Sequence, residues 1–291
     1  MHISATHKLN GIALAVLLTG LLASCGGSPG SGGGTAFSPA PPAVAPPPVI
    51  AQASPTGKIN DSGVLSSSCY QAGSDTLVAC TSAGAIALNP AQDGAVGRDA
   101  DAATNSAADG KLGFSYTKVG AAGEELPATA TSWSCLKDNI TGLIWEVKTT
   151  DGGLRDFNNQ YTNLDGTTPN QLGAPVLPAT SNDPTPAQIA AGTNSVGFVN
   201  AVNAQTLCGA ANWRLPNATE LQGIVDYSVA EPGPAIDVNW FGSTESVVQH
   251  WSNTQLPGLE ANARTVGFFR GSTGSANRST VTRLIRLVRS S

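Results

Sequence analysis

The stretch WRLPNATEL, residues 213–221, contains the clearest fold signal in the chain. Asn217 can cap the first turn of a helix, and Glu220 stands three residues later, which is a capping-box arrangement. Arg214 lies just before this turn between two large apolar side chains. Its aliphatic stem can pack among them while its guanidinium pairs with a carboxylate. We therefore expect Arg214 to stabilise the scaffold rather than to contact a ligand, with Glu220 or Asp226 as its partner.

Hydrophobic periodicity predicts the α+β class. A first helix is expected over 195–209, ending at Gly209, and a second over 217–228, where Leu221, Ile224 and Val225 would share one face. Short alternating segments predict strands at 76–88, 111–119, 143–148, 265–269 and 283–289. The stretches 89–110 and 150–195 are rich in Gly, Pro, Asn and Asp, so we expect long loops that carry function or lack order.

The first residues predict export. Lys8 precedes an apolar run that is too short for a stable transmembrane helix. The run ends in LLASC (21–25), which resembles the lipobox of bacterial lipoproteins. That resemblance implies a signal peptide at 1–24 and lipidation of Cys25; the alternative is ordinary cleavage nearby, with Cys25 left as a thiol. Gly26 resembles the sorting pattern of a bacterial outer-membrane lipoprotein, exposed to the periplasm or at the surface.

Residues 25–57 change from Gly/Ser-rich to Pro-rich and carry no charge. Such a segment cannot bury a core, so we expect a disordered tether, although Pro-rich segments also serve as SH3-type ligands. The remaining residues are expected to form an N-terminal hairpin-containing subdomain over 58–134 and a main domain over 135–291.

An even set of four cysteines follows the lipobox, which predicts disulfides in an oxidising compartment. Three pairings are open. In CYQAGSDTLVAC (69–80) two β runs flank a turn, so the first two cysteines would clamp a hairpin and the last two would pair with each other. The cysteines are Cys69, Cys80, Cys135 and Cys208.

Catalytic and metal-binding patterns are sparse. His250 is the single histidine outside the predicted signal peptide, and no CxxC, P-loop, GxGxxG or nucleophile elbow occurs. The acidic stretch 99–110 has Ala103 at a ligand position of an EF-hand and no closing Glu. We therefore predict no enzyme activity, no metal and no cofactor.

Five motifs identify a family resemblance: TGLIWE (141–146), WRLPNATEL (213–221), HWSNT (250–254), VGFFRG (266–271) and IRLVR (285–289). Taken in order, they resemble the Lcl C-terminal domain family, named after the tip domain of a bacterial collagen-like adhesin. The resemblance implies a compact C-type-lectin-like fold with short antiparallel strands, two helices and long loops. For the named adhesin it implies a trimeric domain that binds sulfated glycosaminoglycans; this chain has no Gly-X-Y repeat, so a collagen-driven trimer is not implied.

Two properties of related folds are not expected here. The loop residues Glu231, Asn239 and Asn253 fall near positions where C-type lectins hold calcium, but the required amide and final carboxylate are missing, so no calcium site is predicted. The chain also resembles formylglycine-generating enzymes around RLP (214–216), yet it has no cysteine after Cys208 for the redox pair of those enzymes.

The distribution of charge suggests a ligand. All 20 acidic residues precede residue 261, whereas residues 261–291 hold six arginines and no acid. Arginine forks match sulfate and carboxylate, so an exposed island would suit a polyanion; the alternative is that these arginines pair with the acidic body. The candidate ligand-binding residues are Arg264, Arg270, Arg278, Arg283, Arg286 and Arg289, together with Trp240.

Among the tryptophans, Trp145, Trp213 and Trp251 are expected in the core and Trp240 at the surface. The acidic balance of the chain, with a sequence pI near 5.1, argues against nucleic acid as a partner. The sequence thus predicts an adhesin-like envelope protein, attached to the membrane through its lipid anchor, that binds anionic or sulfated polysaccharide or extracellular matrix. The alternatives are a structural envelope protein with a protein partner and a divergent formylglycine-generating-type enzyme.

Overall fold

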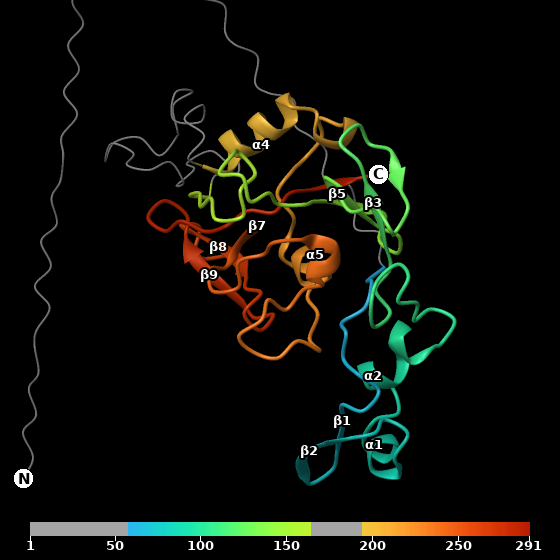
Figure 1. Ribbon diagram of the computed structural model, residues 1–291. Coiled ribbons are helices and arrows are strands. Elements are labelled where there is room, and N and C mark those ends of the chain that lie inside the picture. The colour runs from blue at the N-terminus through green and yellow to red at the C-terminus, as the bar shows by residue number, and fades with distance from the viewer. Residues whose placement is uncertain (1–57, 164–193) are drawn as a thin grey trace, which may run out of the picture. The chain divides into compact units, whose positions relative to one another are not determined.

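The computed structural model describes residues 58–163 and 194–291, which form a mixed arrangement of short antiparallel strands and short helices (Figure 1). The predicted signal peptide, Cys25 and the tether lie outside the described residues, as does most of the predicted loop at 150–195. Within the described ranges, no helix has the length and apolar character needed to cross a membrane.

The strands are short and lie in three sheets. Their bounds are β1 Cys69–Gln71, β2 Ser74–Val78, β3 Tyr116–Val119, β4 Glu125–Leu126, β5 Cys135–Asp138, β6 Leu143–Glu146, β7 His250–Gln255, β8 Asn262–Val266, β9 Thr273–Asn277 and β10 Val288–Ser290. The helices are α1 Ala83–Leu88, α2 Asp93–Val96, α4 Ser195–Ala204, α5 Ala218–Gln222 and α6 Val238–Phe241, with 3-10 turns η1 Arg98–Ala100 and η2 Leu207–Gly209.

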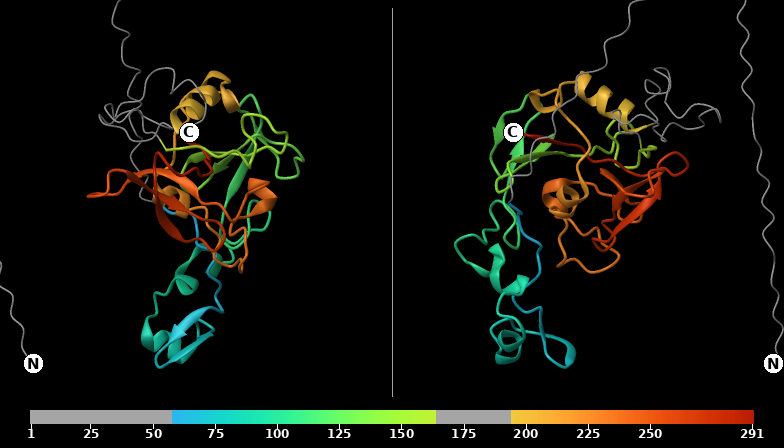
Figure 2. Two further views of the ribbon diagram at one scale, coloured as in Figure 1. Left: turned by 90° about the vertical axis from the view of Figure 1, so that its left-hand side faces the viewer. Right: turned by 180° about the vertical axis from the view of Figure 1, so that it is seen from behind.

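The largest sheet has the order β10-β6-β5-β3-β4, and every neighbouring pair is antiparallel. Its last strand by sequence, β10, pairs with β6 so that Val288 lies opposite Trp145. Figure 1 and the right-hand view of Figure 2 accordingly show the chain end marked C beside the green strands. β3 and β4 precede residue 135, so this sheet joins residues from both sides of the predicted subdomain boundary. A second sheet has the order β7-β8-β9, and β1 and β2 form a separate hairpin.

The five-stranded sheet is buried on both faces because its side chains alternate between two apolar clusters. Leu136 and Trp145 belong to one cluster, and their neighbours Cys135 and Ile144 belong to the other. The predicted core positions of Trp145, Trp213 and Trp251 are confirmed, since each is at most 1 % exposed.

Both predicted helices exist but are shorter than expected. α4 is capped by the Asn194 side chain, which accepts from the backbone N–H of Gly197 at 2.8 Å, and it ends at Ala204 instead of Gly209. The reason lies in the backbone, because Thr206 and Cys208 adopt left-handed φ angles of 48° and 50° that a helix cannot contain.

α5 begins with the predicted capping box between Asn217 and Glu220 and ends at Gln222. Ile224 and Val225 are buried as expected, but they lie beyond the helix. The Ala218 N–H donates to the hydroxyl of Thr254 in β7 at 2.9 Å, which ties the start of α5 to the three-stranded sheet beside it (Figure 1).

Four predicted strands are wrong in extent. In the segment 111–119 only the second half forms a strand, β3. The segment 76–88 contains only the end of β2 and then α1, because Ser82 caps a run of helix-favouring alanines and accepts from the Ala85 N–H at 3.3 Å. The segment 265–269 contributes only the end of β8. In 283–289 regular pairing begins at Val288, preceded by isolated bridges at Arg283 and Leu284. The predicted loop 89–110 contains α2 and η1.

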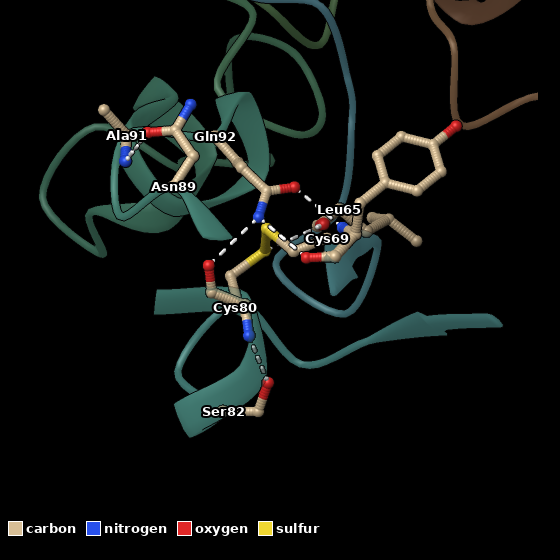
Figure 3. Close-up of a disulfide and its surroundings, with 9 residues drawn as sticks. Leu65, Cys69, Cys80, Ser82, Asn89, Ala91 and Gln92 are labelled. Carbon is tan, nitrogen blue, oxygen red and sulfur yellow. Dashed lines mark hydrogen bonds between the residues drawn. A yellow bond between two sulfur atoms is a disulfide. The ribbon is translucent and has the colours of Figure 1, made fainter. Parts of the chain in front are cut away.

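Both disulfides match the predicted pairing. Cys69 and Cys80, with Cα atoms 5.0 Å apart, clamp the β1–β2 hairpin (Figure 3). Gln92 supports this hairpin, since its side chain accepts from the Tyr70 N–H at 2.7 Å and donates to the Tyr70 carbonyl at 2.9 Å.

The second disulfide joins Cys135 of β5 to Cys208 of η2 across 73 residues, with Cα atoms 6.5 Å apart. Closing a loop of this length stabilises the fold by about 4 kcal/mol in the chain-entropy description. Because the crosslink ties the five-stranded sheet to the turn after α4, it holds together segments that lie far apart in the sequence.

Candidate functional site

Arg214 serves the scaffold, as predicted. Its guanidinium makes two bonds to the Glu220 carboxylate, at 2.8 and 2.7 Å, and both side chains are largely buried, at 13 % and 8 % exposed. Glu220 also accepts from the Asn217 N–H at 2.8 Å, so one carboxylate serves the ion pair and the capping box together. Asp226, the other candidate partner, pairs with Lys111 at 2.6 Å.

The six C-terminal arginines do not form one exposed island. Arg286 is fully buried and donates to the Glu146 carbonyl and the Thr244 hydroxyl, each at 2.8 Å. Arg278 is 4 % exposed and donates to the Asn163 side chain at 2.9 Å. The interpretation of these two arginines as surface ligand contacts is therefore wrong, because the tail runs through the interior instead of over it.

The other four arginines differ in how much they offer to solvent. Arg270 is exposed but pairs with Glu231 at 2.9 Å, and the Arg289 guanidinium lies 5.5 Å from the Trp213 ring. Arg264, in β8, is exposed, and Arg283 is half-buried, with its guanidinium donating to the neighbouring Thr282 carbonyl at 3.0 Å. Arg264 and Arg283 are thus the tail arginines most open to a polyanion.

Trp240 was expected at the surface and is in fact 7 % exposed. It lies in α6 and packs in the same cluster as Tyr116 and Phe241, while its carbonyl accepts from the Trp133 indole at 2.8 Å. The expectation was wrong because α6 folds back onto the sheet. Two other expected loop residues lie in regular structure: Asn239 in α6 and Asn253 in β7.

Two basic side chains, Lys148 and Arg286, form a buried cluster around Glu146. Lys148 donates to its carboxylate at 3.1 Å, and Leu287 donates a backbone N–H to its other oxygen at 2.9 Å. Burial lowers the pKa of Lys148, against the attraction of Glu146, and lowers the pKa of Arg286 to about 10. These contacts fasten the last segment of the chain to β6.

His250 lies at the edge of this cluster and is 2 % exposed, with its ring edge-on to Phe268 at 4.9 Å between centroids. Burial, reinforced by the charges of Arg286 and Lys148, holds the pKa of His250 well below its ordinary value of 6.5. The imidazole is therefore neutral in the folded protein near pH 7 and lies under the surface. In the described ranges, no three or more His, Cys, Asp or Glu side chains are grouped as metal ligands would be.

The structure also contains a concave site that the sequence did not indicate. A pocket of about 480 Å³ opens between the turn that joins β5 to β6, the first turn of α5 and the end of β10. Asp138, Leu143 and Trp145 line it from the sheet, and Thr219 and Glu220 line it from the helix. Its remaining walls come from Lys58, Ile59, Thr141, Gly142, Asn217, Ala218, Gly223, Thr254, Ser290 and Ser291.

The pocket is formed by segments far apart in the sequence and held rigidly. The Asp138 side chain accepts from the N–H groups of Ile140 and Thr141, both at 2.9 Å, which fixes the turn on one side. The capping box and the Arg214–Glu220 ion pair fix the opposite wall. The one local signal for this site was the capping box, which places a rigid polar turn beside an apolar segment.

Comparison with protein families supports the resemblance noted in the sequence. The model of the family described as the Lcl C-terminal domain matches residues 134–289, which include all of β5 and almost all of β10. The chain belongs to the Lcl C-terminal domain family. A search of the curated proteins found no match. The match covers Arg214, its partner Glu220 and most of the pocket. Four lining residues lie outside it: Lys58, Ile59, Ser290 and Ser291.

The scaffold role of Arg214 predicts a specific loss of stability. Arg214→Ala leaves Glu220 buried without its cation, which should lower the free energy of unfolding by about 2 to 4 kcal/mol. Arg214→Lys should retain part of the stability, because one ammonium cannot replace the bidentate fork. Urea denaturation, followed by tryptophan fluorescence, measures both changes.

Glu220→Gln and the Arg214→Ala/Glu220→Gln double variant complete a double-mutant cycle. A coupling energy of about 1 kcal/mol or more between the two positions is expected for such a pair. Additive effects of the two substitutions would contradict the conclusion that the Arg214–Glu220 ion pair links the residues before α5 to the helix.

The buried His250 predicts destabilisation in mild acid. In the unfolded chain the imidazole takes up a proton below about pH 6.5, whereas in the folded protein its low pKa prevents this. The stabilisation is complete above pH 6.5 and is lost as the pH falls, by about 2 kcal/mol between pH 7 and pH 5. Unfolding free energies measured across this range should show a decline in the wild type that is about that much weaker in His250→Phe. Parallel pH profiles would overturn the prediction.

Proposed function

We propose that this protein is an adhesin-like binding protein of the bacterial envelope, lipid-anchored through Cys25, whose Lcl C-terminal domain binds anionic or sulfated polysaccharide or matrix. Membership of the Lcl C-terminal domain family over residues 134–289 is the observation that carries the proposal. The C-type-lectin-like character of the domain and the subdivision at residue 134 are parts of the same proposal. The tether at 25–57 would give the domain reach from an outer membrane.

The exposed arginines suggest how such a ligand would be held. Arg264 and Arg283 offer guanidinium groups that can form paired bonds to sulfate or carboxylate. Arg270 can join them only by giving up its contact with Glu231. With so few open cations each contact is weak, so tight attachment depends on many repeats along the polymer and many copies of the protein.

A protein partner is the second candidate, and one observation favours it. Six of the large apolar side chains that are exposed in the described residues lie between 65 and 96, around the β1–β2 hairpin and its helices: Leu65, Tyr70, Leu77, Ile86, Leu88 and Val96. Clusters of exposed apolar residues are typical of interaction surfaces. An enzyme of the formylglycine-generating type has less support, since Cys135 and Cys208 are both buried and bonded to each other.

Polysaccharide binding predicts a salt-sensitive interaction that depends on Arg264 and Arg283. The Cys25→Ser protein is titrated by biolayer interferometry against immobilised heparin, a uronic-acid polymer and a neutral dextran. Binding to the two anionic polymers should weaken with salt, and Arg264→Gln or Arg283→Gln should each reduce the affinity about two- to fivefold.

Arg270→Gln is the matched control, because its charge is already paired with Glu231, and a smaller effect is expected. Circular dichroism and thermal unfolding verify that each variant is folded. Equal binding to all three polymers, or binding that is independent of salt, would contradict the polyanion proposal.

The proposed lipid anchor predicts that substitution of Cys25 changes how the protein partitions between detergent and water. The wild-type protein made in a Gram-negative host should partition into the detergent phase of a Triton X-114 extraction, because two or more acyl chains anchor a protein stably. Cys25→Ser should move it entirely to the aqueous phase. A wild-type protein found in the aqueous phase, with Cys25 unmodified by mass spectrometry, would rule out the anchor.

A further inference from the structure

We infer that the pocket between α5 and the β5–β6 turn binds an uncharged sugar unit, at a site distinct from the exposed arginines. The inference goes beyond the polyanion proposal, because it concerns different residues and a ligand of different charge. It rests on three properties of the pocket: its size, the engagement of its charged side chains in contacts within the protein, and its combination of carbon surface with hydroxyl groups.

The carboxylates on the walls are already satisfied. Both oxygens of Glu220 accept bonds from Arg214, and one of them also accepts from the Asn217 N–H. Asp138 is held by two backbone N–H groups, and burial raises the pKa of this carboxyl. Neither group is therefore poised to recognise a cation. Lys58 is the one lysine or arginine among the lining residues, and it already has an interaction within the protein. The site suits a ligand without net charge.

The remaining walls combine apolar surface with hydroxyl groups. Ile59 and Leu143 supply carbon surface, which suits the C–H face of a sugar ring, whereas Trp145, at 1 % exposed, offers almost none. Among the lining residues, Thr219 is exposed, and Thr254 accepts a bond from the Ala218 N–H while its own hydroxyl hydrogen stays available to donate. A sugar ring presents this same combination of a C–H face and a hydroxyl edge.

Trp145 provides an independent indication that the site takes a polar ligand. Its indole Nε1 is buried, and the described protein atoms provide no acceptor for it. Buried indole N–H groups are nearly always hydrogen-bonded, so an acceptor from outside the protein is expected. A sugar hydroxyl in the pocket that Trp145 lines, or a water held with it, would meet this need.

The dimensions set the scale of the ligand. A volume of about 480 Å³ falls in the range of small-molecule pockets. It accommodates one or two sugar rings, and the rest of a longer chain would have to lie outside the pocket. The walls are fixed by the capping box, the ion pair and the Asp138 turn, so the site is largely formed before the ligand arrives. Binding of a single small unit in such a site is expected to be weak, with a Kd of about a millimolar.

The test follows the Trp145 indole N–H by nitrogen-15 NMR during titration of the Cys25→Ser protein with maltose, cellobiose, lactose and chitobiose. Trp145→Phe assigns the signal, and the loss of its N–H removes no hydrogen bond to the described residues. At least one of the four sugars should shift this signal saturably. Failure of all four to shift it would overturn the proposal.

Thr219→Trp supplies the blocking variant, because Thr219 is exposed on the pocket wall and a large side chain there fills the opening. Gln222→Trp is its matched control: it lies on the same helix but does not line the pocket. Thr219→Trp should weaken sugar binding at least about tenfold, and Gln222→Trp should leave it unchanged. An equal response in both variants would overturn the assignment of the site.

Heparin binding of the same variants distinguishes this inference from the polyanion proposal. If the two sites are separate, Thr219→Trp retains its salt-dependent heparin affinity, whereas Arg264→Gln retains its sugar-induced shift of the Trp145 signal. A shift of that signal by heparin alone, with none of the four neutral sugars active, would refute the neutral-sugar site and leave the polyanion proposal standing.

Discussion

The buried carboxylate of Glu146 is the constraint on which the rest of the structure depends. It accepts from Lys148 and from the backbone of Leu287, and the carbonyl of the same residue accepts from Arg286. These bonds fasten the final segment of the chain to β6. Around that segment, Leu284 bridges to His250 of the three-stranded sheet and Val288 pairs with β6 in the five-stranded sheet. The C-terminal segment therefore connects the two sheets by pairing with a strand of each. Removing one partner from such a buried group leaves an uncompensated charge, so the cluster ties the fold to one arrangement.

The position of the C-terminal segment also explains how the pocket forms. The backbone of Arg214 bridges to Val288, and its side chain holds Glu220 at the start of α5. One residue thus connects the last strand to the first turn of the helix, and the pocket lies where these elements meet the β5–β6 turn. The groups that make its walls rigid are the same groups that stabilise the fold. A binding site built in this way needs little rearrangement, because its walls are already held by ion pairs and caps.

The six C-terminal arginines differ in burial. Of the arginines in the tail, Arg286 and Arg278 stabilise the interior, whereas Arg264 is exposed and Arg283 is half-buried. The proposed contacts to a polyanion are few and exposed, so they provide attraction that is screened by salt. The charged side chains of the proposed sugar site are engaged within the protein, so the site would supply selectivity that salt barely affects. A polymer that carries both neutral and anionic units could engage both kinds of site.

Features with a local cause could be predicted from the sequence. The capping box of Asn217 and Glu220 spans four residues, and the hairpin between Cys69 and Cys80 is closed by its own turn. The family motifs likewise carried enough information to identify the family. Burial was different, because it depends on which distant segment covers a residue. The sequence alone could not separate Arg286 from Arg264, show that Trp240 is covered, or bring Trp145 beside Thr219. Only the tertiary structure decided these, since the desolvation of a charged or aromatic side chain is set by neighbours that the chain brings together when it folds.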